Sequence, residues 1–100
     1  MRKLALLIAL MLTGAGHAQD EANQAAARAY NAAAVLQNTG LYDQAAVKWQ
    51  EFVTKYPKDK RVDRAAYYHG VCLLRSKKFP EAAAAFDQVL KKWKALGNIS

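Results

Sequence analysis

The chain has 100 residues, a formal net charge of +7 and a hydrophobic content of 53%, which predicts one small domain. Its single cysteine, Cys72, excludes an intramolecular disulfide and a cysteine metal cluster, and we expect it to be a buried apolar residue. Proline occurs only at positions 57 and 80, and no stretch alternates apolar and polar residues as a strand does. The composition therefore predicts an all-α protein.

Residues 1–18 have the three-part pattern of a secretory signal peptide. Arg2 and Lys3 form a basic start, an apolar run extends from Leu4 to Leu12, and small residues end at Ala18. This run is much shorter than the roughly 20 residues that span a bilayer as a helix. We therefore predict cleavage after Ala18, export, and a helical domain at residues 19–100.

Charge is distributed unevenly along residues 19–100. Residues 19–54 carry a net charge of −2, whereas residues 55–100 carry +7. The charge of the basic half has two interpretations: contact with an anionic membrane or envelope polymer, or only the solubility of an Ala-rich helical protein. No nucleic-acid partner is expected. The basic patch predicted in this half comprises Lys58, Lys60, Arg61, Lys77, Lys78, Lys91, Lys92 and Lys94.

The first two helices are predicted at residues 21–38 and about 42–56. Gly40 permits the turn between them, and Pro57 ends the second because proline disfavours helical geometry in the preceding residue. Apolar residues recur at steps of three and four in both segments, as one face of a helix requires. These residues are Ala22, Ala25, Ala29, Ala32, Ala33 and Leu36 in the first, and Tyr42, Ala45, Trp49, Phe52, Val53 and Tyr56 in the second.

Two further helices are predicted in the second half. The third begins near Asp59, whose carboxylate is expected to cap its free amides. The residues "SKKF" form a turn, and the fourth helix runs from Pro80 to about Leu96. The apolar face expected on the third helix comprises Val62, Ala66, His69, Gly70 and Leu73.

The second and fourth helices repeat one pattern at an offset of 37 residues. Large residues match large ones and small residues match small ones, which indicates duplication of one packing unit. Repeat 1 then covers about residues 20–57 and repeat 2 about residues 58–97. The matched pairs are Tyr42 with Phe79, Ala45 with Ala82, Trp49 with Phe86, Phe52 with Val89, Val53 with Leu90, and Tyr56 with Trp93.

This pattern resembles the tetratricopeptide repeat, and the resemblance covers residues 26–94. In repeat 1 the matching positions are Ala33, Leu36, Gly40, Tyr42, Ala45, Trp49, Phe52 and Pro57. In repeat 2 they are Gly70, Leu73, Phe79, Ala82, Phe86 and Val89. Repeat 2 departs by having Lys77 where repeat 1 has Gly40, and the Tyr-Pro that closes repeat 1 is similar to tetratricopeptide proteins of bacterial envelopes. The resemblance implies two stacked helix-turn-helix hairpins that bind a protein or peptide. Together with the export signal, it implies the periplasm of a Gram-negative bacterium as the location.

The resemblance also implies a binding groove along the first helix of each hairpin. Its tyrosines and arginines suit a peptide with apolar and acidic residues, although the tyrosines also fit a purely structural role in covering the helix seams. A chaperone-tail partner is disfavoured, because Tyr30 and Ala34 stand where such a clamp needs Lys and Asn. The groove positions are Ala27, Tyr30, Asn31, Ala34, Gln37 and Asn38 from repeat 1, and Arg64, Tyr67, Tyr68, Val71, Leu74 and Arg75 from repeat 2.

The sequence offers no constellation for catalysis, and we expect neither an enzyme nor a cofactor. His69 is the only histidine after residue 18, and its position predicts a packed core residue rather than a base or metal ligand. Because stacked arrays usually need about three repeats, two repeats predict a marginal monomer, self-association or stabilisation by a partner.

Overall fold

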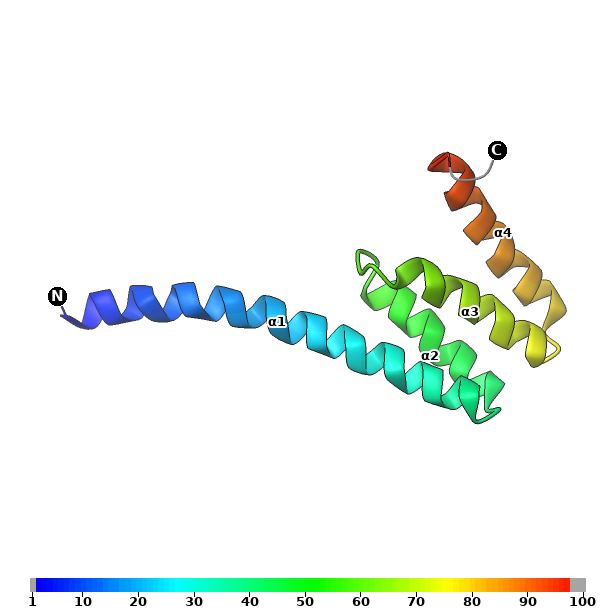
Figure 1. Cartoon of the computed structure of the whole chain (residues 1–100), viewed down its shortest axis with the longest axis horizontal. Coiled ribbons are helices and arrows are strands. Elements are labelled where there is room, and N and C mark those ends of the chain that lie inside the picture. Colours follow the sequence, from blue (N-terminus) through cyan, green and yellow to red (C-terminus); the bar gives the residue numbers. More distant parts are fainter. Residues whose placement is uncertain (1, 98–100) are drawn as a thin grey trace.

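The computed structural model describes the backbone of residues 2–97 and the side chains of residues 18–97. Its four helices are α1 (Arg2–Asn38), α2 (Tyr42–Lys55), α3 (Val62–Arg75) and α4 (Phe79–Ala95), with no strand among the described residues (Figure 1). Each helix packs against the next one in the chain. The predicted all-α fold of two stacked hairpins is confirmed. None of the helices in the described segment has the length and hydropathy needed to cross a bilayer.

The core lies where α3 covers the hairpin formed by α1 and α2. Trp49 and Phe52 of α2 are 0% and 1% exposed. The Tyr30 ring of α1 meets the Trp49 ring edge-on at 4.8 Å, and the Tyr68 ring of α3 lies 5.2 Å from it. Aromatic pairs at these separations favour tilted and edge-on geometries, as observed. One tryptophan therefore joins three helices.

Small residues allow the helices to approach closely. Ala33 of α1 and Ala45 of α2 are fully buried. In repeat 2, Gly70 of α3 faces the Phe86 ring so closely that an added Cβ would lie 2.6 Å from Phe86 Cε1. The predicted tight crossing between helices at these positions is confirmed.

The two hairpin turns have the same backbone geometry. Gly40 has a φ of 83°, and Lys77, which occupies the equivalent position, has a φ of 64°. The Leu41 amide donates to the Leu36 carbonyl at 2.9 Å, and the Lys78 amide donates to the Leu73 carbonyl at the same distance. This is the Schellman closure of a helix end. A lysine in this left-handed conformation costs about 1–2 kcal/mol.

Two helix starts differ from the predicted ones. α1 begins at Arg2 rather than residue 21, because residues 2–20 contain no proline and many good helix formers. α3 begins at Val62, and its first turn has no side-chain cap. Asp59 instead accepts hydrogen bonds from the Arg61 backbone amide and from Arg61 Nε, both at 2.8 Å. The prediction that Asp59 caps α3 is therefore wrong, because its carboxylate holds the preceding turn.

The apolar stripes of α2 and α4 have different environments. The α2 stripe is buried or half-buried, whereas Leu90 and Trp93 on α4 are 51% and 42% exposed. Packing predicted for these two residues is incomplete because no helix of the described residues lies on the far side of α4 (Figure 1). On α1, the predicted stripe residues Ala22 and Ala32 are exposed while Ala26 is buried. Ala22 precedes the part of α1 that the shorter α2 reaches. Ala32 is turned by about 100° from the buried Ala33 and so faces away from α2.

Candidate functional site

The predicted groove follows α1 and α3, and side-chain contacts hold these helices next to each other. The Arg61 guanidinium lies over the Tyr30 ring, 5.9 Å from its centroid. Thirty-five residues apart in the chain, the Cys72 thiol donates a hydrogen bond to Gln37 Oε1 at 3.4 Å. The structure therefore brings the groove positions of the two repeats onto adjacent helices.

Three of the groove residues take part in helix packing. Gln37 Oε1 accepts a hydrogen bond of 2.7 Å from Trp49 Nε1, which satisfies the indole N–H at the centre of the core. Tyr30 of α1 and Tyr68 of α3 are half-buried, and both rings contact Trp49. These contacts assign the three side chains a role in joining the repeats.

Five of the remaining groove residues present polar or aromatic groups to solvent, whereas Leu74 is an exposed aliphatic residue and Ala27, Ala34 and Val71 are half-buried. Arg64 and Arg75 are exposed on α3, and Tyr67 between them is 50% exposed. The Arg75 guanidinium lies 5.7 Å from the centroid of the Tyr42 ring, a cation–π contact that restricts its position. Asn31 and Asn38 are exposed on α1. This part of the groove offers donors and an aromatic face to a partner.

The basic residues predicted as one patch are divided between two ends of repeat 2. Lys77 and Lys78 follow the C-terminus of α3, whereas the other six belong to the turn before α3 and the last turns of α4. With 14 residues, α3 separates the two groups by about 21 Å. Several of these residues also have acidic neighbours, as in the pairs of Lys91 with Asp87 at 3.0 Å and Lys78 with Asp43 at 3.6 Å.

Arg61 forms a two-pronged ion pair with Asp59. Its guanidinium Nε and Nη2 donate to the two carboxylate oxygens of Asp59 at 2.8 and 2.9 Å. Hydrogen bonding from the Arg61 side chain lowers the pKa of Asp59 to about 2. Arg61 is thereby fixed in the turn before α3 and over Tyr30, where it supports packing between the repeats.

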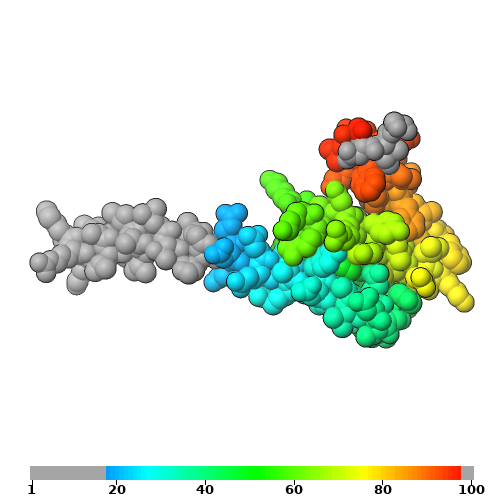
Figure 2. Space-filling view, viewed as in Figure 1, coloured from blue at the N-terminus to red at the C-terminus, as the bar shows by residue number. Residues whose placement is uncertain are grey.

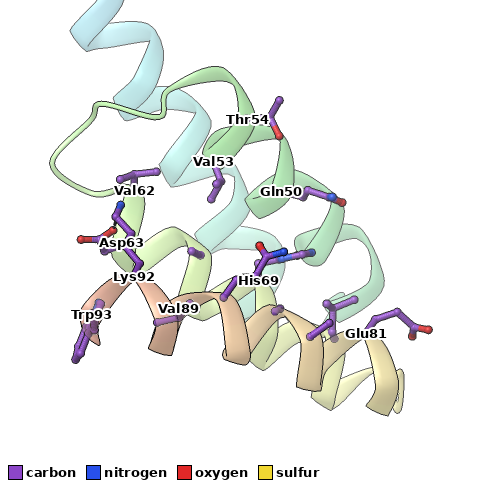
Figure 3. A pocket seen from close by; sticks show the side chains of 15 residues that line it. Gln50, Val53, Thr54, Val62, Asp63, His69, Glu81, Val89, Lys92 and Trp93 are labelled. Atoms are coloured by element: carbon purple, nitrogen blue, oxygen red, sulfur yellow. Dashed lines mark hydrogen bonds and ion pairs between the residues drawn. The ribbon is translucent and has the colours of Figure 1, made fainter. Parts of the chain in front are cut away.

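A first hollow, of about 560 Å³, lies between α2, α3 and α4. Figure 3 shows Asp63 and Lys92 side by side at one end of it and Glu81 at the other. His69, predicted as a packed residue, is half-buried and lines this hollow, and burial lowers its pKa. This lowered pKa keeps the His69 imidazole neutral near pH 7.

The described side chains offer little for metal binding or nucleophilic chemistry. No group of three or more His, Cys, Asp or Glu residues is placed to hold a metal ion between residues 18 and 97. Cys72 is fully buried as predicted, and burial raises the pKa of its thiol. A buried thiol of raised pKa is a poor nucleophile.

A second hollow, of about 700 Å³, was not foreseen as a site. It lies on the outer side of α3 and α4, and we call it the end face. The sequence assigns its α4 residues to packing, Arg64 and Tyr67 to the groove and Lys60 to the basic patch, and it does not bring these three sets together. It is lined by Lys60, Asp63, Arg64, Tyr67, Phe86, Val89, Leu90 and Trp93.

Comparison with known proteins identifies the family. No curated protein and no solved structure matches the chain. A family model described as tetratricopeptide repeat matches residues 6–59 and 64–94. These segments include most of both hairpins and make up most of the chain. The chain therefore belongs to the tetratricopeptide repeat family.

Proposed function

We propose that this chain is a peptide-binding module that holds an acidic and apolar segment of a partner protein along the exposed side of α3. Tetratricopeptide repeats are in general protein–protein interaction modules and non-catalytic scaffolds. The carrying observation is the series Arg64, Tyr67, Val71 and Arg75, which follows one side of α3 at helical spacing.

The dimensions of this series suit a short extended peptide. Arg64 and Arg75 are 11 residues apart on one helix, which corresponds to about 16 Å. An extended chain covers that distance in about five residues. Tyr67 and Val71 supply an apolar surface between the two guanidiniums, and Ala27 and Ala34 on the neighbouring α1 leave room for side chains. A peptide with carboxylates at its two ends and apolar residues between them fits best.

The site of action that we propose is the bacterial envelope, specifically the periplasm of a Gram-negative cell. The pattern of residues 1–18 supports this proposal, since it has the parts of an export signal. α1 continues through residue 18 and the family match begins at residue 6, so cleavage stays a prediction. Intact-mass measurement of the periplasmic and cytoplasmic fractions of a Gram-negative host tests it, and a periplasmic form that begins at residue 19 is expected.

Site-directed photocrosslinking in cells tests the binding surface. A photoreactive residue at Asn31, which is exposed on the groove side of α1, is expected to capture a partner protein. Val47 on α2 is a matched control, because it is 54% exposed and lies outside the groove. Capture from Asn31 should fall about tenfold or more with Arg75→Glu, since a charge-assisted hydrogen bond contributes roughly 1.5–3 kcal/mol.

Two outcomes would contradict the proposal. Equal capture from Asn31 and Val47 would indicate non-specific proximity. Capture that is insensitive to Arg75→Glu and disappears at moderate salt would instead favour a diffuse charge contact, such as a membrane surface.

A further inference from the structure

The end face is an apolar surface that the described helices leave uncovered, beside the last turns of α4, which project away from the hairpin of α1 and α2 in Figure 2. It runs between the first turns of α3 and the last turns of α4, which diverges from the other helices in Figure 1. Tyr67 is 50% exposed, and Leu90 and Trp93 are 51% and 42% exposed. Large apolar side chains gathered in one hollow usually mark an interaction site.

The repeat shows what kind of structure covers such a face. Each end-face residue on α4 has an equivalent 37 positions earlier in the chain, on α2. Those equivalent residues form a face that α3 covers, where Trp49 and Phe52 are almost completely buried. The end face is therefore the uncovered equivalent of an occupied helix site. The equivalent pairs are Tyr67 with Tyr30, Phe86 with Trp49, Val89 with Phe52, Leu90 with Val53, and Trp93 with Tyr56.

The covering helix, α3, indicates the side chains that such a site accepts. Ala65 and Cys72 are fully buried, and the Tyr68 ring lies against Trp49. These three positions are separated by three and four residues, so they form one stripe of small, aromatic and small side chains. A helix with the same stripe fits the equivalent end face.

The charged residues around the end face determine which kind of helix can bind there. Lys60 and Arg64 line the α3 side of the hollow. Lys94 is exposed one turn beyond Leu90 on α4. The nearby Asp63 carboxylate forms an ion pair with Lys92. The rim is therefore basic on both sides and favours an occupant with acidic flanks.

A second copy of the chain fits this face poorly. Two end faces placed together would oppose like charges from Lys60, Arg64 and Lys94. In a head-to-tail stack, the α1 positions equivalent to the α3 stripe would meet the end face. Those positions are Arg28, Asn31 and Val35, all exposed, and the first two are polar.

We propose that the end face binds an acidic amphipathic helix of a partner protein, which packs on Phe86, Leu90 and Trp93 as α3 packs on the equivalent residues of repeat 1. This surface shares Arg64 and Tyr67 with the groove proposed above, but it extends from them onto α4, whereas the groove continues along α3 to Arg75. It buries apolar side chains that the two repeats leave exposed, and its basic rim sets the charge of the partner.

A labelled synthetic peptide tests the proposal on the whole chain. The probe is a 16-residue amphipathic helix, roughly four turns, with Ala, Tyr and Ala at the stripe positions and glutamates on both flanks. The control peptide has lysines in place of the glutamates. Fluorescence anisotropy is expected to show binding of the glutamate peptide, with binding of the lysine peptide at least about tenfold weaker.

Matched variants locate the peptide. Leu90→Gln should weaken binding about tenfold or more, whereas Val47→Gln, a change at an aliphatic residue of similar exposure on α2, should leave it unchanged. Arg75→Glu, which alters only the groove, should also leave it unchanged. Equal effects of Leu90→Gln and Val47→Gln would overturn the proposal, as would equal binding of the two peptides.

Two further results would also overturn it while leaving the groove intact. Loss of peptide binding with Arg75→Glu but not with Leu90→Gln would place the peptide in the groove. A dimer in sedimentation that Leu90→Gln dissociates would show that a second copy occupies the end face.

Discussion

Repeat 1 and repeat 2 have the same backbone turns and the same order of large and small residues, but different surroundings. In repeat 1, α3 covers the aromatic face, so Trp49 is completely buried. In repeat 2, the equivalent Phe86 is half-buried, and Leu90 and Trp93 remain about half exposed. The comparison shows that a duplicated hairpin does not cover its own apolar face, and that burial depends on the next helix.

The aromatic faces of repeat 1 and repeat 2 also differ in their hydrogen-bonding groups. In repeat 1, Gln37 accepts from the Trp49 indole and from the Cys72 thiol. In repeat 2, Leu74 is equivalent to Gln37 and Phe86 is equivalent to Trp49. Apolar groups therefore replace both the acceptor and the indole donor. An indole N–H in the covered face needs a partner, whereas a phenyl ring needs none.

The largest expected effect comes from removing the aromatic residue at the centre of the covered face. Trp49→Ala should lower the free energy of unfolding by about 3–5 kcal/mol, because it leaves a cavity among three helices. Trp93→Ala in the open face should lower it by much less, about 1 kcal/mol, because 42% of this side chain is already exposed. Urea denaturation followed by circular dichroism measures both values, and similar losses would contradict the difference between the faces.

A polar exchange between the repeats sharpens the comparison. Gln37→Leu should cost about 1–3 kcal/mol of stability, because the Trp49 N–H then loses its acceptor in a buried position. Trp49→Phe removes the N–H but also leaves space in the core, so the double variant, which reproduces the pair found in repeat 2, should lose less stability than the sum of the two single losses. Additive losses would show that the hydrogen bond does not explain the pairing.

Substitutions at Lys77 and Gly40, the equivalent positions of the two hairpin turns, should have opposite effects on stability. Lys77→Gly should stabilise the protein by roughly 0.5–1 kcal/mol, since it relieves a positive φ but increases the freedom of the unfolded chain. Gly40→Ala should destabilise it by about 1 kcal/mol for the reverse reason. Thermal melts of the two variants and of Lys78→Ala, a control in the same turn, check the signs.

The smallest expected effect is a pH dependence from His69. Burial lowers its pKa in the folded state, so the unfolded state binds a proton more readily. Stability should therefore fall as pH drops below the unfolded value near 6.5 and should level off below the folded pKa. Comparing urea midpoints of the chain and of His69→Gln at pH 7.5 and 5.5 isolates this contribution, and equal pH dependence in both would contradict it.

Periodicity and turn chemistry are sufficient to predict much of the fold from the sequence. The α2 stripe, the Gly40 turn and the small residues at the crossings are local or repeated signals, and the structure confirms them. Asp59 was assigned to the wrong hydrogen bond because its partner, Arg61, competes within the same turn. A sequence pattern marks a carboxylate that can cap but does not indicate which nearby donor it prefers.

The surfaces are less predictable because exposure depends on which helices are neighbours. The periodicity of α4 marks Leu90 and Trp93 as apolar-face residues, but it carries no information on whether another helix covers them. In the groove, the family pattern marks Tyr30, Gln37 and Tyr68 without showing that their side chains are engaged with Trp49. Those contacts are three-dimensional and involve residues far apart in the chain.

Acrylamide quenching of tryptophan fluorescence tests the central difference between the repeats most directly. The chain contains only Trp49 and Trp93, which are 0% and 42% exposed. The native protein should therefore show one strongly quenched and one protected component, and Trp93→Phe should retain only the protected one. A readily quenched Trp49 in the folded Trp93→Phe variant would contradict the stacking of α3 on the first hairpin.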